Sequence, residues 1–292
     1  MTVQEPLPAP SNPLGIDGIE FVEYATSQPN ALGALLELMG FALVARHRSR
    51  EVLLYRQGDM NVIVNADAVN AGAGPAPATP YLSGVALRVR DASYAYKHTI
   101  DLGAWPIPTR AAAMELNIPG IHGVGDSVLY FVDRYQDFSI YNVDFKPYSA
   151  SMTQPPAVAG LHFFGIVQAI GADRNAEWLD FYAHLLGFRA LPDSAFPGIL
   201  RKGLLLESPC GKFYLQLIEP PEGAEEIQWD EQLLRIGLGT SDVLAAARVL
   251  RDRGVVFVDR SPLQVSERGA LTQSYLGGVM FELVRSQLRV AS

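Results

Sequence analysis

Two ionisable side chains stand in strongly apolar stretches of this sequence. Glu282 lies in VMFELV and His162 lies in GLHFFGIVQAI. Burial of a lone carboxylate costs several kcal/mol unless something pairs with it, so Glu282 predicts either a buried partner or a strand edge that faces water. His162 is either a hydrogen-bonded core histidine or a ligand. These two residues are the first candidates for a functional site.

Arg235 is a third charged residue in an apolar stretch, LLRIGLGTSD. Arginine is always protonated in proteins, so it cannot serve as a metal ligand. Its planar guanidinium is suited to a carboxylate partner, which it grips with two parallel hydrogen bonds. If Arg235 is buried, we therefore expect it to hold a carboxylate through two N–H···O bonds.

Four segments of the chain follow one plan that would position these side chains. Each has an opening strand, an amphipathic helix that stops at Gly, and further strands, roughly βαβββ. Two such units side by side form an open, cup-shaped mixed sheet with helices outside, an α+β fold. The alternative is an ordinary α+β protein whose repeats are accidental. The opening strands are expected at 15–25, 83–89, 160–170 and 233–242, the helices at 31–39, 91–102, 175–186 and 242–253, and the closing strands at 52–56, 60–65, 127–132, 139–145, 203–207, 212–218, 255–258, 270–276 and 278–285.

The units pair into two modules, at 12–147 and 160–292. The segment YSASMTQPPAVA (148–159) between them has the Pro, Ala and Ser composition of a linker. Residues 1–11 are Pro-rich and are expected to form a loosely held arm.

Composition and charge exclude several classes of protein. The net charge of −8 argues against a nucleic-acid or anionic-membrane partner. No apolar run is long enough to span a membrane, and the N-terminus lacks the pattern of a signal peptide. A single cysteine, Cys210, excludes an internal disulfide. We expect a cytoplasmic protein, and a homo-oligomer is compatible with the sequence.

Specific stretches resemble a known family. NPLGIDGIEFVEYA, LMGFALVARHRSREVLLYRQGDMNVIVN, MELNIPGIHGVGDSVLYFVDR and SIYNVDF resemble the N-terminal module of bacterial 4-hydroxyphenylpyruvate dioxygenases, which have the vicinal-oxygen-chelate fold. GLHFFGIVQAI, LLRIGLGTSD, LTQSYL and GVMFELVR are similar, more loosely, to strands of that family's C-terminal catalytic module. The resemblance implies an Fe(II)-dependent dioxygenase that acts on an aromatic 2-oxo acid, in the catabolism of aromatic compounds.

The resemblance also assigns roles to single residues. His162 and Glu282 match the first and last metal ligands, and their ligating atoms are then expected about 3–4 Å apart on the concave face. Arg235 stands where the family has its second histidine, so the resemblance implies that its guanidinium replaces the positive charge of the metal. We therefore predict that Arg235 pairs with Glu282 through two N–H···O bonds. Gln273 matches a substrate-binding residue. Ile218 replaces a family asparagine, and Gln216 on the same strand is the substitute.

Other parts of the sequence offer weaker sites. In the N-terminal cup, the strand positions that correspond to the family's metal ligands are occupied by Gly18, Gly84 and Asn142 or Asp144. We therefore predict no metal site there. None of the remaining histidines is spaced as a partner for His162; they are His47, His98, His122 and His184. The chain ends at Ser292, so we expect no C-terminal helix of the kind that closes the family's active site.

Three functions remain open from the sequence. The first is an active Fe(II) dioxygenase of 4-hydroxyphenylpyruvate or a related 2-oxo acid. The second, which we favour, is a protein that binds a small carboxylate or aromatic 2-oxo acid without a complete iron site. The third is another metal-assisted lyase or isomerase of the same fold. Metal content and oxygen uptake would separate them.

Overall fold

The computed structural model describes residues 12–67, 77–108, 115–136, 138–149, 153–192, 198, 203–221 and 229–286. The predicted N-terminal arm at 1–11 lies outside these residues. The first unit consists of β1 (Ile19–Ala25), α1 (Pro29–Leu38), β2 (Ala42–His47), β3 (Val52–Gln57) and β4 (Met60–Asn65). The second consists of β5 (Tyr81–Arg88), α2 (Ala92–Asp101), β6 (Gly120–His122), the 3₁₀ turn η1 (Val124–Asp126), β7 (Val128–Val132), α3 (Ile140–Asp144) and β8 (Phe145–Pro147).

The C-terminal half repeats this order. A 3₁₀ turn η2 (Val158–Gly160) leads into the third unit, which consists of β9 (His162–Ala169), α4 (Asn175–Leu186), β10 (Arg189–Ala190), β11 (Leu204–Glu207) and β12 (Tyr214–Ile218). The fourth consists of β13 (Gln232–Thr240), α5 (Val243–Asp252), β14 (Gly269–Leu271) and β15 (Phe281–Arg285). The predicted module boundaries stay a prediction. Within the predicted linker, η2 is the one helical turn in the part that is described.

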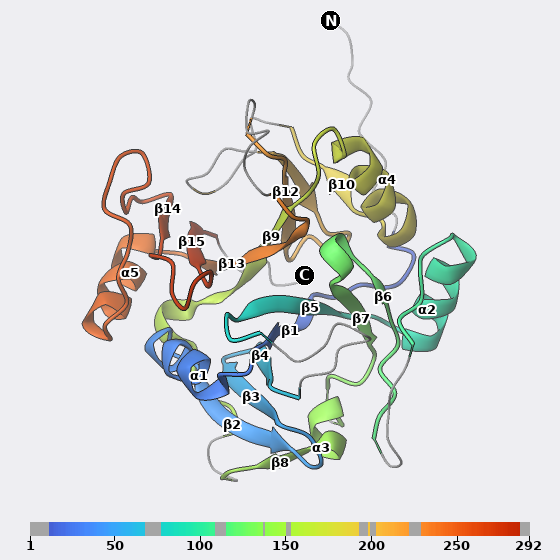
Figure 1. Ribbon diagram of the computed structural model, residues 1–292, viewed down its shortest axis with the longest axis horizontal. Coiled ribbons are helices and arrows are strands. Elements are labelled where there is room, and N and C mark those ends of the chain that lie inside the picture. Colours follow the sequence, from blue (N-terminus) through green and yellow to red (C-terminus); the bar gives the residue numbers. More distant parts are fainter. Residues whose placement is uncertain are drawn as a thin grey trace, which may run out of the picture.

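Strand pairing shows the same plan in both halves. The opening strand of each unit pairs in parallel with a later strand of its own unit, as in β1–β4, β5–β7, β9–β12 and β13–β15. It also pairs antiparallel with the opening strand of its neighbour, as in β1–β5 and β9–β13. Each pair of units thereby builds one open, curved sheet (Figure 1). The predicted α+β class and cup-shaped mixed sheets are confirmed.

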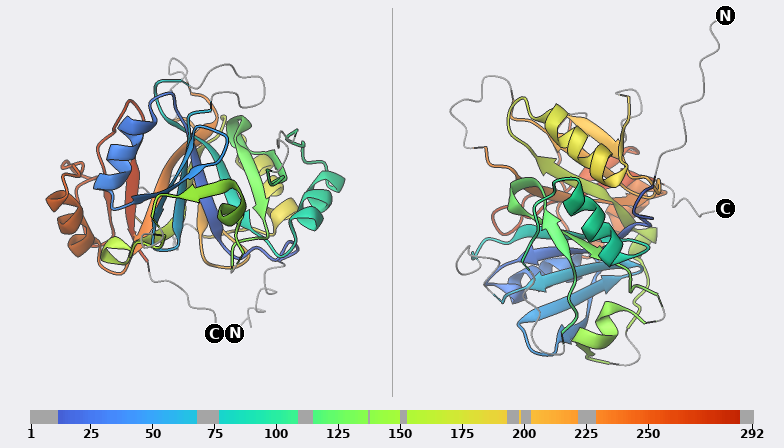
Figure 2. Two further views of the ribbon diagram at one scale, coloured as in Figure 1. Left: turned by 90° about the horizontal axis from the view of Figure 1, so that it is seen from below. Right: turned by 90° about the vertical axis from the view of Figure 1, so that its right-hand side faces the viewer.

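The two sheets meet at one narrow point. Leu233 of β13 pairs with Leu82 of β5, and this is the one register pair between the modules in the described residues. A 2.5 Å ion pair from Lys212 Nζ to Asp17 Oδ1 also crosses between the halves. Figure 2 (right) shows the N-terminal half, in blue to green, below the C-terminal half in yellow and orange.

Helices α1, α2, α4 and α5 lie outside the sheets, as expected (Figures 1 and 2). Their apolar faces and the convex faces of the strands form the main hydrophobic core, which includes Leu32, Leu36, Leu186 and Leu250. Aspartate side chains cap two of these helices at their N-termini: Asp91 accepts a hydrogen bond from Tyr94 N at 2.8 Å, and Asp242 accepts one from Ala245 N at 2.9 Å. Gly187 ends α4 with a φ of 80°, a conformation that a residue without Cβ adopts freely.

The predicted strand at 139–145 is wrong, because Ile140–Asp144 forms the short helix α3. Asn142 Oδ1 accepts hydrogen bonds from Ser139 N at 2.9 Å and from Ser139 Oγ at 2.8 Å, which favours a helical turn at this point. The buried side chains of Ile140 and Tyr141 then pack with Phe21 and Leu54 into a second, smaller hydrophobic cluster. Helix α3 therefore fills part of the N-terminal cup.

Two other predicted strands are shorter than expected. In 255–258 the backbone forms only an isolated bridge, from Phe257 to Thr272. In 270–276 the ladder ends after Leu271. The carbonyl of Tyr275 accepts hydrogen bonds from Gly278 N and Val279 N, so a tight turn replaces the end of the strand.

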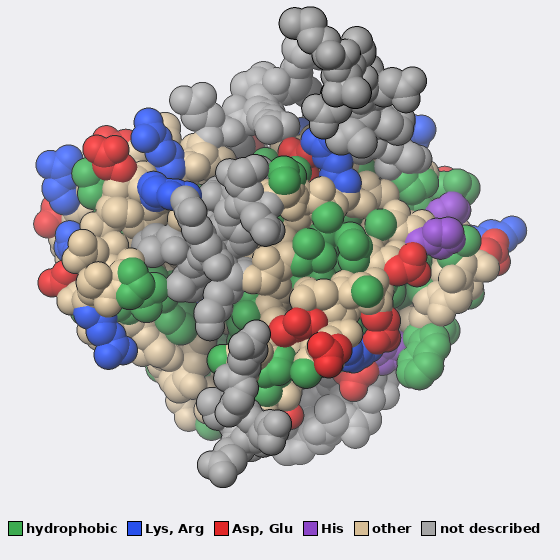
Figure 3. All heavy atoms as spheres, turned by 90° about the horizontal axis from the view of Figure 1, so that it is seen from above, with side chains coloured by type: hydrophobic (Ala, Val, Ile, Leu, Met, Phe, Trp, Pro, Cys, Tyr) green, Lys and Arg blue, Asp and Glu red, His purple; other side chains and the backbone are tan. Residues whose placement is uncertain are grey.

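No helix in the part of the chain that is described has the length and apolar character to cross a membrane. On the right-hand half of the face in Figure 3, hydrophobic side chains lie next to a group of acidic ones. This agrees with the net charge of −8.

Candidate functional site

Three neighbouring strands position the residues of the predicted site. Along β13, Gly237 pairs with Glu282 of β15, and Gly239 pairs with His162 of β9. Arg235 lies two residues before Gly237, so its side chain projects from the same face of the strand. Neither glycine has a side chain to fill the space between these groups. A Cβ on Gly239 would lie 2.3 Å from His162 Nε2, so the imidazole lies directly over this strand.

Arg235 and Glu282 form a buried ion pair. Arg235 Nε donates to Glu282 Oε2 at 3.0 Å, and the two side chains are only 9% and 6% exposed. The predicted contact is present, but through one hydrogen bond instead of two. Arg235 Nη2 is buried and has no hydrogen-bond partner among the residues that the structure describes. The pair thus neutralises the carboxylate and leaves one guanidinium nitrogen available to another acceptor.

A small cavity adjoins Glu282. Its lining includes Gln216, which is buried on β12, and the stacked rings of Phe164 and Tyr214, whose centroids are 4.9 Å apart. A Cβ on Gly198 would lie 2.9 Å from Glu282 Oε1, so this backbone closes over the carboxylate. The cavity has a volume of about 20 Å³, which is room for roughly one water molecule.

His162 has polar partners other than Glu282. Among the described residues, its Nδ1 lies 3.3 Å from Gly160 O and its Nε2 lies 3.3 Å from Ser286 Oγ. The carbonyl can only accept, so Nδ1 carries the proton and Nε2 accepts from the serine hydroxyl. Burial lowers the pKa of His162, against the hydrogen bond to Gly160 that raises it. The imidazole is therefore neutral at pH 7.

Gln273 lies apart from this group. Its side chain is exposed, its backbone N donates to Val256 O at 2.9 Å, and it does not line the cavity beside Glu282. The structure thus brings Arg235, Glu282 and Gln216 together, places His162 on the neighbouring strand, and leaves Gln273 outside.

The residues of this cup do not fit a bound iron ion. A facial Fe(II) site needs two imidazoles and a carboxylate that converge on one point. Here Arg235 supplies a cation in place of an imidazole and already engages Glu282. In the described residues, no group of three His, Cys, Asp or Glu side chains lies close enough together to hold a metal.

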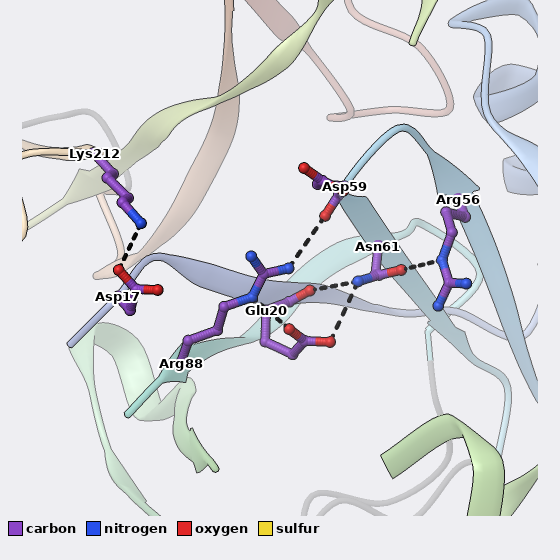
Figure 4. A network of polar contacts seen from close by, with 7 residues as sticks. All are labelled: Asp17, Glu20, Arg56, Asp59, Asn61, Arg88 and Lys212. Atoms are coloured by element: carbon purple, nitrogen blue, oxygen red, sulfur yellow. Dashed lines mark hydrogen bonds and ion pairs between the residues drawn. The ribbon is translucent and has the colours of Figure 1, made fainter. Parts of the chain in front are cut away.

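The concave face of the N-terminal cup holds a second buried ion pair (Figure 4). Arg88 Nε donates to Glu20 Oε2 at 2.6 Å, and Glu20 is 1% exposed. Asn61 Nδ2 donates to the Glu20 backbone carbonyl at 2.9 Å, and Asn61 Oδ1 accepts from Arg56 Nε at 2.6 Å. Burial raises the pKa of Glu20, although Arg88 acts in the opposite direction.

A further buried carboxyl group, Glu23, lies at the other end of this cup. Asn65 Nδ2 donates to Glu23 Oε1 at 2.7 Å, Ser83 Oγ donates to the Glu23 backbone carbonyl at 3.3 Å, and Tyr130 hydrogen-bonds to the Glu23 side chain. Burial raises the pKa of Glu23, and these hydrogen bonds only partly oppose that shift. Glu23 borders a cavity of about 670 Å³. Sequence reasoning missed both Glu20 and Glu23, although the signal used for Glu282, a carboxylate in an apolar strand, is present in IEFVEYA.

Comparison with known proteins gives the family. The family model described as the N-terminal part of hydroxyphenylpyruvate dioxygenase matches residues 11–146. The chain is 37% identical to hemolysin VllY of Vibrio vulnificus, over 85% of this chain and 73% of that protein. It is 33% identical to 4-hydroxyphenylpyruvate dioxygenase of Pseudomonas aeruginosa, over 85% of this chain and 72% of that protein. The structure resembles a mutant of 4-hydroxymandelate synthase from Streptomyces coelicolor with a TM-score of 0.71 and 14% identity, over 96% of this chain and 95% of that one. The chain therefore belongs to the 4-hydroxyphenylpyruvate dioxygenase family.

Proposed function

We propose that this protein is a member of the family in which the Arg235 guanidinium replaces the metal ion, and that its C-terminal cup binds a small carboxylate or aromatic 2-oxo acid. The observation that carries the proposal is the buried Arg235–Glu282 ion pair. A metal ion at this point would face a fixed positive charge and a carboxylate that is already neutralised.

The same pair supports the class of ligand. A carboxylate prefers a guanidinium partner, and the buried Arg235 Nη2 is a donor without an acceptor. Gln216 lines the adjoining cavity and offers an amide beside it. About 20 Å³ is too small for an organic acid, so binding requires Phe164 or Tyr214 to move aside. Phenylalanine and tyrosine rings on this face would then contact the aromatic part of the ligand.

Metal content tests the first half of the proposal. The protein is purified without added metal, incubated with Fe(II) under argon, desalted, and measured by mass spectrometry. We expect iron, zinc and manganese to be far below one per chain. Arg235→His, which restores a second imidazole, should gain Fe(II) binding, whereas Arg235→Lys, which keeps the charge, should not. Stoichiometric iron in the wild type, lost in both His162→Ala and Glu282→Ala, would refute the proposal.

Ligand titration tests the second half. Calorimetry with 4-hydroxyphenylpyruvate should show binding to the metal-free wild type. Arg235→Met should bind at least tenfold more weakly, a difference of about 1.4 kcal/mol. Arg174→Met is a matched control, because Arg174 pairs with Glu177 on the outside of the module and should leave the affinity unchanged. Equal binding by the wild type and Arg235→Met would show that the ligand lies elsewhere.

An active Fe(II)-dependent dioxygenase is the second candidate. It is favoured by the identity of 33% to a protein named 4-hydroxyphenylpyruvate dioxygenase. This candidate predicts oxygen uptake when Fe(II), ascorbate and 4-hydroxyphenylpyruvate are supplied. If the Arg235 guanidinium replaces the metal ion, oxygen uptake should not exceed the rate measured for a Glu282→Gln control. We also propose, from the sequence alone, that the protein is cytoplasmic.

A further inference from the structure

The cavity in the N-terminal cup has the size of a small-molecule site. Its volume is about 670 Å³, against about 20 Å³ for the cavity beside Glu282. Pockets that hold metabolites and drug-sized molecules span roughly 300–1,000 Å³. Among the described residues, the N-terminal cup thus has room for an organic ligand, although the family resemblance assigned no site to it.

The walls of this cavity are mainly apolar. Phe21 and Ile63 project from β1 and β4 on the concave face of the sheet, and Phe145 closes the side next to α3. Leu116 and Ile118 cover it from the segment before β6, and Leu233 reaches in from β13 of the other module. A ligand would bury apolar or aromatic surface here at about 25 cal/mol for each Å² removed from water.

Glu23 is the polar anchor of the cavity. It is 5% exposed and accepts a hydrogen bond from Asn65 at 2.7 Å. It forms no ion pair with a basic side chain in the described residues, unlike Glu20 and Glu282. Arg50 lowers the pKa of Glu23 through its charge, but burial outweighs this effect. Ionisation of Glu23 is therefore still destabilising, and a cationic ligand in contact with its carboxyl group would stabilise the ionised form.

The remaining charges point to the same class of ligand. Three other carboxyl groups line the cavity: Glu115, Asp126 and Asp144. The one Lys or Arg among the described lining residues is Arg50, and it forms an ion pair with Glu115. Burial lowers the pKa of His47, which keeps that imidazole neutral, and His122 is the other titratable base. The cavity is acidic on balance, so it disfavours the carboxylate ligands of the C-terminal cup.

We propose that the N-terminal cup is a second ligand site, which binds a small organic cation, an amine with an apolar or aromatic body, through an ion pair between its ammonium group and Glu23. This site is independent of the function proposed for Arg235, because no residue is shared between the two. Arrival of an ammonium group favours the ionised form of Glu23. Since burial raises the pKa of Glu23 in the free protein, binding should release a proton.

The test compares three probes with the same body. 2-Phenylethylamine, 2-phenylethanol and phenylacetate are titrated into the full-length protein by calorimetry. We expect the amine to bind at about 1 mM or below and at least tenfold more tightly than phenylacetate. The heat of amine binding should depend on the ionisation enthalpy of the buffer between pH 5 and 7, in the direction of proton release. Binding of phenylacetate as tight as that of the amine, or no binding of the amine at about 1 mM, would overturn the proposal.

Variants locate the site. Glu23→Gln should weaken amine binding at least tenfold and abolish the proton release. Glu177→Gln is the control: it removes a carboxylate that is 64% exposed, pairs with Arg174 on the outside of the other module, and does not line the cavity, so it should change the affinity less than twofold. Leu116→Trp, at a half-buried position of the wall, should block the amine even if Glu23→Gln fails to fold. Unchanged amine binding in Leu116→Trp would place the ligand outside this cavity.

Discussion

Replacement of Arg235 by alanine tests whether the Arg235–Glu282 pair stabilises the fold. Arg235 Nε lies 3.0 Å from Glu282 Oε2. Two unit charges about 4 Å apart attract each other by about 4 kcal/mol at an effective dielectric constant of about 20. Arg235→Ala removes this attraction and leaves a carboxylate that is 6% exposed. Loss of one partner of a buried pair costs roughly 3–5 kcal/mol. Since whole domains are stable by about 5–15 kcal/mol, this loss would be a large fraction of the total.

Urea unfolding at pH 7, followed by circular dichroism, measures this loss. The informative control is Arg235→Met with Glu282→Leu, which removes both charges and fills the space with apolar atoms. Buried pairs replaced in this way are often neutral or more stable by about 1–4 kcal/mol. We therefore expect the double variant to recover most or all of the stability lost in Arg235→Ala. A change below about 0.5 kcal/mol in Arg235→Ala, which is usual for a surface site, would contradict the pairing argument.

Three further predictions concern stability. Glu23→Gln should become progressively more stable than the wild type as the pH rises above 4.5, the ordinary pKa of glutamate. The reason is that ionisation of the buried wild-type residue favours the unfolded chain. A difference in unfolding free energy between the two proteins that is constant from pH 4 to pH 7 would rule this out. Gly165→Ala should lower the free energy of urea unfolding by about 1–3 kcal/mol, because its Cβ would lie 2.2 Å from Tyr214 O in the paired strand. Gly278→Ala is the control: its Cβ would have no neighbour within 4 Å, so stability should change by less than about 0.5 kcal/mol. Asp242→Ala should cost about 0.5–2 kcal/mol, since it removes the hydrogen bond to Ala245 N at the start of α5, and Asp242→Asn should retain most of that stability.

The elements that the sequence predicted correctly are those in which local signals agree with burial. Helix α4 begins and ends at the predicted residues, since its apolar face and Gly187 act together. The pairing of Arg235 with Glu282 could be predicted because a buried carboxylate needs a partner. Helix α3 could not be predicted, because SIYNVDF alternates like a strand. Its helical turn depends on the hydrogen bonds from Ser139 N and Ser139 Oγ to Asn142 Oδ1.

The residues around the site could not be predicted in full, because their positions depend on turns and long-range packing that a strand alignment does not contain. Gln273 was placed in the cup by resemblance, but the ladder ends at Leu271 and a turn follows. His162 was expected near Glu282, yet the nearest polar groups are Gly160 O and Ser286 Oγ. The cavity beside Glu23 arises from segments as distant as Phe21 and Leu233, and only the packing of the two modules brings them together.

Strand β13 takes part in both cups. Gln232 and Leu233 line the N-terminal cavity, and Arg235, two residues further along the same strand, holds Glu282 in the C-terminal cup. A small shift of this strand would alter the wall of one cup and the ion pair of the other together. By thermodynamic linkage, such an effect is reciprocal. If a ligand in the N-terminal cup changes the affinity of the C-terminal cup for its ligand by some factor, the ligand of the C-terminal cup changes the affinity of the N-terminal cup by the same factor. The covalent backbone of a few residues thus connects the wall of the N-terminal cavity to the ion pair of the C-terminal cup.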